Sequence, residues 1–260
     1  MRPDEAMEKS LIIALQTALH ELGFDPNGID GWAGANTKSA AADYLAARQV
    51  RDTPPPIVFA GAGKRLDDWD LPVIGARIGV GEDHVHAVID VEAAGSGFDE
   101  EGRVRMLFEP HVFYRELGPG LERDRAVAAG LAYPRWGQRA YPRDSYPRLL
   151  AAIAINENAA LRSASWGLGQ IMGFNALLAG YPDARAMVTA FIVDEELHLA
   201  AMVAFIIASG LDDELRRRDW SGFARGYNGA SYAVHGYHTK LAAAYAKWAR
   251  IPDTPIPEAA

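Results

Sequence analysis

Residues 85–98 read VHAVIDVEAAGSGF, and this stretch decides how the rest of the chain is interpreted. Its apolar residues recur at helical spacing, and Glu92 falls on the same stripe, four residues after Val88. The helix is predicted to continue through Ala94 and to end at Gly95, because glycine breaks helices. The sequence therefore predicts a carboxyl group at the C-terminal end of an apolar helical face.

The predicted environment of Glu92 favours its protonated form. Burial in an apolar face penalises the charged carboxylate, and the negative end of the helix dipole adds to that penalty. A glutamic acid that stays protonated near neutral pH is a proton donor for catalysis. The alternative interpretation is a boundary residue whose carboxylate reaches solvent.

Composition and charge exclude several classes of function. The chain has 260 residues, enough for one large domain or two unequal ones. It contains no cysteine, and its seven histidines form no ligand cluster, so we expect no metal and no other cofactor. The net charge of −8 argues against nucleic-acid binding. No apolar run reaches the length of a membrane span, so we expect no stable membrane insertion.

The N-terminal part of the sequence predicts a small helical module. Residues 8–22 form an amphipathic helix, residues 25–31 are dense in turn formers, and Thr37 caps a second helix. The apolar positions of the first helix are Leu11, Leu15, Leu19 and Leu22. The alternative interpretation of this part is a helical hairpin that packs onto the main domain.

A proline- and glycine-rich stretch marks the domain boundary. Residues 51–64 read RDTPPPIVFAGAGK, a composition typical of linkers. We therefore expect an N-terminal module at residues 1–52, a linker at 53–65, a main domain at 66–250 and a disordered tail at 251–260.

The main domain is predicted to be mostly helical, with one small β-element. Val104, Met106 and Phe108 alternate with charged residues and predict a short strand. Residues 167–180, GLGQIMGFNALLAG, predict a helix interrupted at a glycine. The strongest helical pattern of the chain runs from Asp183 to Gly210.

Three stretches do not look like plain core. They are VEAAGSGF around Glu92, SASWGLGQIM with Ser165, Trp166 and Gln170, and ARGYNGASY with Tyr227 and Asn228. In this order they resemble the pattern of goose-type lysozyme-like muramidases and lytic transglycosylases. Together with LFEPHVFYREL and LAYPRWG, they resemble the N-acetylmuramidase domain of phage endolysins, over roughly residues 66–248.

The N-terminal module resembles a peptidoglycan-binding domain of the three-helix type. The matching residues include Asp30, Gly31 and Thr37, while the AADYLAARQV end departs from the usual pattern of that family. The two resemblances imply a mainly α fold, in which a small three-helix module precedes a lysozyme-like helical catalytic domain with a short β-hairpin. They also imply peptidoglycan as the partner, and we expect a monomer.

The resemblance implies hydrolysis of the β-1,4 bond between N-acetylmuramic acid and N-acetylglucosamine, with Glu92 as general acid. Glu101 and Glu109 are the candidates for a second carboxylate, and Asp99 and Glu100 are weaker substitutes. Glu101 could equally be a solvated loop charge, and Glu109 a structural partner of Arg103 or Arg115. The substrate-binding candidates are Ser165, Trp166, Gln170, Tyr227 and Asn228, although Trp166 could also be a core residue.

Two alternatives to hydrolysis stay open. A lytic transglycosylase would form an anhydro-sugar with one glutamate acting as acid and then base, and a wall-binding protein would keep the fold without catalysis. The N-terminus lacks the pattern of a signal peptide. With the resemblance, this suggests a lysin held in the host cytoplasm until it is released to the periplasm and cell wall.

Overall fold

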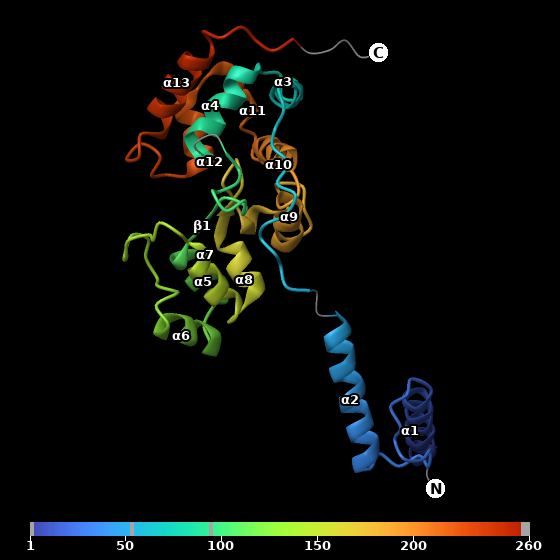
Figure 1. The fold of residues 1–260 in the computed structure, drawn as a ribbon. Coiled ribbons are helices and arrows are strands. Elements are labelled where there is room, and N and C mark those ends of the chain that lie inside the picture. Colours follow the sequence, from blue (N-terminus) through green and yellow to red (C-terminus); the bar gives the residue numbers. More distant parts are fainter. Residues whose placement is uncertain (1–2, 53–54, 94–95, 256–260) are drawn as a thin grey trace. The chain divides into compact units, whose positions relative to one another are not determined.

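The computed structural model describes residues 3–52, 55–93 and 96–255 (Figure 1). The chain forms two compact units, Met1–Ile57 and Val58–Ala260, which are treated separately below. The predicted helix end at residues 94–95 and the last five residues of the predicted tail lie outside the described residues. Among the described residues, no helix combines the length and apolarity needed to cross a membrane.

The smaller unit contains two helices in its described residues, where the sequence predicted three. These helices are α1 (Pro3–Glu21) and α2 (Ala35–Asp52). Leu19 is buried, but Leu15 is 46% and Leu22 58% exposed, so much of the predicted apolar stripe faces solvent. The side chain of Leu11 lies outside the described part.

The larger unit is mainly helical, as predicted. Its elements are α3 (Asp70–Ala76), α4 (Glu82–Ala93), β1 (Met106–Phe108), α5 (Pro110–Leu117), α6 (Leu121–Ala128), α7 (Tyr146–Ile153), α8 (Glu157–Arg162), β2 (Ala164–Trp166), β3 (Ile171–Met172), η1 (Gly173–Asn175), α9 (Ala184–Phe191), α10 (Glu195–Ala208), α11 (Asp212–Arg217), α12 (Trp220–Asn228) and α13 (Tyr237–Trp248). Asp183 and Asp219 accept hydrogen bonds at the first turns of α9 and α12, as their predicted capping roles require.

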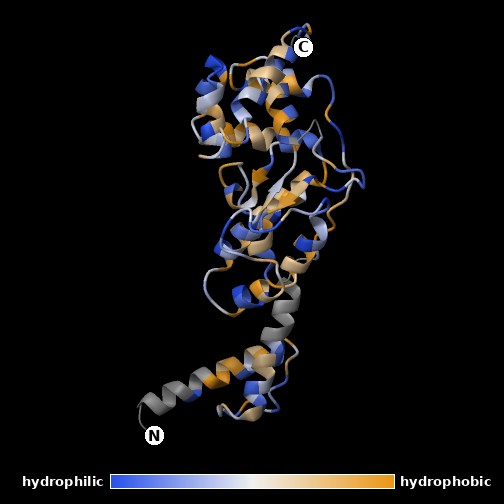
Figure 2. Cartoon of the chain, turned by 90° about the vertical axis from the view of Figure 1, so that its left-hand side faces the viewer, coloured by the Kyte–Doolittle hydropathy of each residue, from blue (hydrophilic) through white to orange (hydrophobic). Residues whose placement is uncertain are grey.

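An apolar core surrounds α4. Val85, Val88 and Ile89 are buried, as their helical spacing predicted. They pack with apolar residues of the neighbouring helices: Leu71, Ile74, Leu199, Met202, Phe223 and Leu241. Figure 2 shows hydrophobic and hydrophilic residues side by side on the helices of this unit, as expected for helices with one buried face. This core fixes the direction in which α4 presents Glu92.

The small β-element is a three-stranded antiparallel sheet in the order β1-β2-β3. Met106 pairs with Trp166, and Ser165 pairs with Met172. The strand predicted near residues 104–108 is therefore confirmed. The helix predicted over residues 167–180 is wrong, because this stretch supplies the turn between β2 and β3, strand β3 and the short helix η1.

Residues 58–66, here called the connector segment, pack against the larger unit. Phe59 is buried and stacks on Trp166 at 5.8 Å between ring centroids. Its carbonyl accepts a hydrogen bond from Val104 N at 3.2 Å, and Lys64 N donates to Val193 O at 3.0 Å. The sequence grouped most of this segment with the linker, whereas the structure places it in the compact unit Val58–Ala260.

The C-terminal tail also contacts the larger unit. The backbone N–H of Thr254 donates a hydrogen bond to Glu82 Oε1 at 2.7 Å, at the first turn of α4. The prediction of a disordered tail is therefore wrong for this part of it.

Candidate active site

Glu92 lies one residue before the end of α4, at the edge of the buried core. Its Oε1 accepts a hydrogen bond from Asn228 Nδ2 at 2.8 Å. Burial raises the pKa of Glu92 to about 7, although the hydrogen bond from Asn228 and the charge of Lys240 oppose the shift. Desolvation outweighs these two effects because the charged form loses its hydration. Glu92 is therefore a carboxylic acid that holds its proton up to about neutral pH.

Tyr227 and Asn228 are the last two residues of α12. Tyr227 fixes the position of this helix end, and Asn228 contacts Glu92 directly. The Tyr227 hydroxyl donates to Gly169 O at 2.7 Å, which ties α12 to the turn between β2 and β3. Burial and the charge of Glu92 raise the pKa of Tyr227 well above its usual value. Asn228 Oδ1 is buried and has no hydrogen-bond partner within the described part of the chain. It therefore leaves an acceptor free beside the acid.

Ser165 and Gln170 stabilise the turn between β2 and β3. Ser165 Oγ donates to Gln170 Oε1 at 2.8 Å, and Gln170 Nε2 donates to Gly167 O at 2.9 Å. Gln170 has a φ of +45°, a left-handed conformation that is uncommon outside glycine. The Gln170 amide thus makes its hydrogen bonds within the turn that also receives the Tyr227 hydroxyl.

Trp166 is not available to a substrate. Its side chain is 0% exposed, and its indole Nε1 donates to Leu161 O at 3.0 Å. Phe59 covers one face of the ring. The prediction that Trp166 contacts sugar is therefore corrected, since a tryptophan on the buried strand β2 belongs to the core.

The loop carboxylates Asp99 and Glu101 gather around Arg103. Glu101 is 63% exposed at its side chain, and one of its oxygens lies 3.3 Å from Arg103 Nη2. Asp99 accepts from Arg103 Nε at 2.8 Å, and Glu100 is exposed. These contacts describe a solvated ion-pair cluster, which is the structural alternative that the sequence left open for Glu101.

Glu109 has a more enclosed position than Glu101. It lies between β1 and α5 with 15% of its side chain exposed, and His111 Nδ1 is 3.2 Å from its Oε2. The Tyr141 hydroxyl donates a hydrogen bond to the same oxygen. The alternative partners considered from sequence have other ion pairs, because Arg103 binds the loop carboxylates and Arg115 pairs with Glu116.

Tyr237 is a residue that the sequence interpretation missed. It is the first residue of α13, and burial raises the pKa of its hydroxyl, with further contributions from the charges of Glu92 and Glu109. The pKa of one phenol therefore responds to both carboxyl groups, and we take the surroundings of Tyr237 as the region that relates Glu92 to Glu109. The sequence signal was modest: a tyrosine directly after the helix-starting Gly236, nine residues beyond Asn228.

Two loops meet at the outer side of this region. The rings of Trp136 and His235 lie 5.6 Å apart in an edge-to-face contact, and those of His235 and Tyr237 lie 6.1 Å apart. The side chain of Trp136 also acts on Tyr141, the partner of Glu109, and slightly lowers the pKa that burial raises. Figure 1 shows the two loops on the left of the larger unit, one following α6 and the other preceding α13. Aromatic side chains thus connect the surroundings of Glu92 with those of Glu109.

The three candidates in the smaller unit surround one buried side chain, Gln16. Gln16 Nε2 donates to Asp30 Oδ1 at 2.9 Å and to Thr37 Oγ1 at 2.9 Å, and Gly31 N donates to its Oε1 at 2.9 Å. A small cleft next to this network is lined in part by Trp32, whose side chain is 76% exposed. The network shapes the loop, and Trp32 gives it an exposed aromatic surface.

In the part of the chain that the structure describes, no group of three or more His, Asp or Glu side chains is arranged to hold a metal ion.

A helical core with a small antiparallel sheet, carrying a buried glutamic acid and a second enclosed carboxylate, is the arrangement expected of a lysozyme-like glycoside hydrolase. A family model described as "Muramidase: N-acetylmuramidase" matches residues 82–249. Because the match spans more than half of the chain, the chain belongs to the N-acetylmuramidase family. It is thus a glycoside hydrolase that acts on peptidoglycan.

One solved structure extends the likeness to nearly the whole chain. A Burkholderia AP3 phage endolysin is 32% identical, with a TM-score of 0.62, over 92% of this chain and 95% of that one. No match is found among curated proteins.

Proposed function

We propose that this chain is a phage endolysin in which Glu92 protonates the β-1,4 bond between N-acetylmuramic acid and N-acetylglucosamine. The raised pKa of Glu92, about 7, supports this assignment most directly, because a general acid must carry its proton at the working pH. The unpartnered Asn228 Oδ1 adds an acceptor suited to an N-acetyl N–H of the substrate. The hydrogen bond of the Tyr227 hydroxyl holds Asn228 and the β2–β3 turn at fixed positions relative to that acid.

We assign the second carboxylate to Glu109. As Glu92 delivers its proton to the glycosidic oxygen, the C–O bond breaks and positive charge develops on the sugar carbon. The Glu109 carboxylate, held by Tyr141 and next to His111, would stabilise that charge or accept a proton from the attacking water. Glu101 is less suited, because it is largely exposed and paired with Arg103.

Three isosteric variants test these assignments. Glu92→Gln should lose at least about 100-fold in kcat on purified peptidoglycan, the usual scale for removing a general acid. Glu109→Gln should lose activity by a comparable factor, whereas Glu101→Gln should stay close to the parent. An active Glu92→Gln enzyme would overturn the assignment of the acid. If Glu109→Gln keeps the parent activity and Glu101→Gln is inactive, the second carboxylate is Glu101 and not Glu109.

Product analysis separates hydrolysis from transglycosylation. A hydrolase adds water and leaves a reducing muramic acid end, while a transglycosylase leaves an anhydro end that is lighter by one water. Mass spectrometry of digested peptidoglycan should show reducing ends. Anhydro ends would instead favour a single-glutamate mechanism in which Glu109 is dispensable.

We also propose that the smaller unit binds peptidoglycan through the loop around Asp30 and Trp32, whose shape the buried Gly31 and Thr37 help to hold through their hydrogen bonds with Gln16. The exposed Trp32 of this loop supports the proposal, because exposed aromatic rings commonly stack on sugars and apolar stems. We further propose that the protein acts as a monomer, in which the larger unit of one copy supplies both Glu92 and Glu109.

The finer lineage and location follow from the resemblance to endolysins. We place the catalytic unit in the goose-type branch, on the order of its Glu92, Gln170 and Tyr227–Asn228 motifs. We further propose that the protein remains in the host cytoplasm until the membrane opens and then reaches the cell wall. A fluorescent fusion followed through infection should change from cytoplasmic to wall-associated only at lysis.

A further inference from the structure

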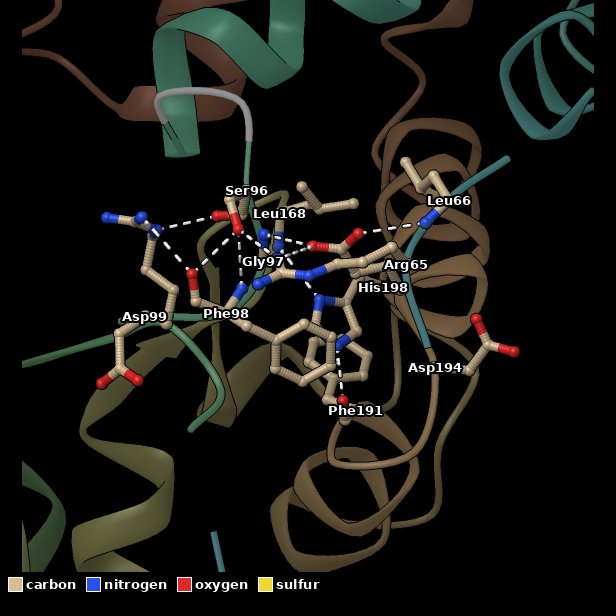
Figure 3. Close-up of polar contacts among 12 residues, drawn as sticks. Arg65, Leu66, Ser96, Gly97, Phe98, Asp99, Leu168, Phe191, Asp194 and His198 are labelled. Atoms are coloured by element: carbon tan, nitrogen blue, oxygen red, sulfur yellow. Dashed lines mark hydrogen bonds and ion pairs between the residues drawn. The ribbon is translucent and has the colours of Figure 1, made fainter. Parts of the chain in front are cut away.

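Glu195 is a buried carboxylate at the start of α10 that the proposed chemistry does not use. Its side chain is 5% exposed, and its Oε1 accepts hydrogen bonds from Gly97 N at 2.8 Å and from Arg65 Nη1 at 2.9 Å. Its Oε2 accepts from Leu66 N at 3.1 Å. A carboxylate is costly to bury unless it is paired, and here the connector segment supplies the pairing cation. Figure 3 shows Arg65 and Leu66 of the connector segment and Gly97 gathered beside His198 of α10.

One of those partners, Gly97, belongs to the loop that follows α4, and its neighbour Ser96 is bonded as well. Arg65 Nη1 also donates to Ser96 Oγ at 2.5 Å (Figure 3). Arg105 Nε donates to Ser96 O at 2.7 Å. Gly97 lies so close to His198 that a Cβ there would be 2.3 Å from the ring Nδ1. Gly97 thus has no room to shift toward α10, and its N–H is fixed by Glu195.

The contacts of Glu195 with Gly97 and Arg65, here called the anchor, pack against the rigid and uncharged ring of His198. Its side chain is fully buried, and its ring nitrogens contact Phe191 O at 2.6 Å and Leu168 N at 3.3 Å. Burial lowers the pKa of His198 to about 4, so the ring is neutral at working pH. The charge balance at the anchor therefore depends on Glu195 and Arg65.

The anchored loop begins four residues after Glu92. The groups that face Glu92 are Tyr227 and Asn228 from α12 and Tyr237 and Lys240 from α13. The last turns of α4 are also tied to α13, because Asp90 accepts hydrogen bonds from Lys247 Nζ at 3.0 Å and from Trp248 Nε1 at 2.8 Å. Gly97 adds a second fixed point on the chain beyond Glu92. A small displacement there changes both the direction of the Glu92 carboxyl and its access to water.

We propose that Glu195 is a positioning residue for Glu92 and that its ion pair with Arg65 of the connector segment is required for this role. The ion pair fixes Gly97, and the fixed loop keeps Glu92 in its desolvated place. This inference rests on the proposed role of Glu92 as the general acid.

The test compares Arg65→Met and Glu195→Gln with the matched control Lys64→Met. Lys64 neighbours Arg65, but it pairs with Asp194 and Glu196 at the start of α10, at 3.2 and 3.7 Å. The readouts are kcat, KM and the pH profile of kcat/KM on soluble peptidoglycan fragments. In the parent, the alkaline limb of this profile should fall near the pKa of Glu92, about 7.

Both test variants should lower kcat about tenfold with KM changed less than about twofold, the pattern of a misplaced catalytic group. Their alkaline limb should move to lower pH by roughly half a unit or more, because water that reaches Glu92 favours the ionised form. Arg65→Lys, which retains a cation, should lie between them and the parent. Lys64→Met should superimpose on the parent.

An unchanged alkaline limb in folded Arg65→Met and Glu195→Gln enzymes would overturn the inference, as would an equal shift in Lys64→Met. Circular dichroism establishes that each variant is folded, and an Arg65→Lys profile measured in parallel keeps the test valid if Arg65→Met fails to fold. Failure of the proposed function has a different signature, which is an active Glu92→Gln enzyme.

Discussion

At the scale of single residues, the same burial of Glu92 serves catalysis and costs stability. Glu92 is protonated in the folded protein up to about pH 7, whereas an unfolded glutamic acid has a model value of 4.5. The folded state therefore binds the proton more tightly. The stability linked to this proton is fully present below about pH 4.5 and is lost as the pH rises through about 7.

We therefore expect Glu92→Gln to stabilise the protein under alkaline conditions. The pKa difference corresponds to at most about 3 kcal/mol at pH 8, since one pKa unit equals about 1.4 kcal/mol. At pH 5 most of this gain should vanish. Thermal unfolding at both pH values measures it, with Glu101→Gln as the exposed control. Equal unfolding temperatures for Glu92→Gln and the parent at pH 8 would contradict a raised pKa.

Residues whose role depends on solvent access were the hardest to assign from sequence. Glu101 and Glu109 are both glutamates shortly after the same helix, and nothing in the sequence distinguishes an exposed carboxylate from an enclosed one. Their difference comes from Tyr141, which reaches Glu109 from 32 residues further along the chain. Trp166 was ambiguous for the same reason, because Phe59 covers it from the connector segment.

At the scale of elements, amphipathic helices were predicted well and glycine-rich stretches were not. The α4 helix followed from its apolar spacing, and Asp183 and Asp219 marked helix starts. Residues 167–180 carry equally apolar residues, but β3 within this stretch pairs with β2, and β2 in turn pairs with the distant strand β1. Helical propensity gave way there to backbone pairing in a sheet that β1 completes from far away in the sequence.

The long helix predicted after Asp183 is divided into α9 and α10 by a similar tertiary effect. The connector segment bonds to the break: Gly63 N donates to Ile192 O, Lys64 N to Val193 O, and Glu195 N donates to Lys64 O. Backbone groups that would have joined two helical turns are used by the connector instead. Asp194 then caps α10 with its side chain.

The loops that follow α6 and precede α13 give an element-scale prediction. Trp136 contacts His235 and acts on the pKa of Tyr141, so it relates the surroundings of the two carboxyl groups through aromatic side chains. Trp136→Ala should lower kcat/KM by roughly tenfold, on the order of a lost aromatic contact with its loop ordering. Trp136→Phe should recover part of this, since it keeps the ring contact and loses the indole N–H.

Fragment hydrolysis rates for the two variants measure the effect, and Leu121→Ala, an exposed residue of α6, is the matched control. If Trp136→Ala matches this control, the two loops have no part in the reaction.

At the scale of the whole molecule, the residue at which a truncated chain begins should decide how stable the isolated larger unit is. A chain beginning at Val58 keeps the connector segment and the complete core of the larger unit. A chain beginning at Asp67 loses Phe59 from the core and leaves Glu195 without Arg65. The second truncation should be less stable by about 3 kcal/mol or more, given one buried aromatic ring and one unpaired buried charge.

Urea unfolding of the two truncated chains measures this difference. The chain beginning at Val58 should also hydrolyse soluble fragments at the parent rate and sediment less with intact cell walls. Unchanged sedimentation would contradict wall binding by the smaller unit. Equal stability of the two truncated chains would show that the connector segment contributes nothing to the fold.

The sequence by itself determined the local properties of this protein: the apolar face of α4, the carboxyl at its end, the capped helices and the ordered motifs of the family. These follow from spacing and residue type, which act over a few neighbouring residues. Tertiary structure alone decided which second carboxylate is enclosed, that Trp166 is core, and that residues 58–66 belong to the catalytic unit. Each of these depends on burial and pairing between residues far apart in the chain, and such contacts exist only once the chain has folded.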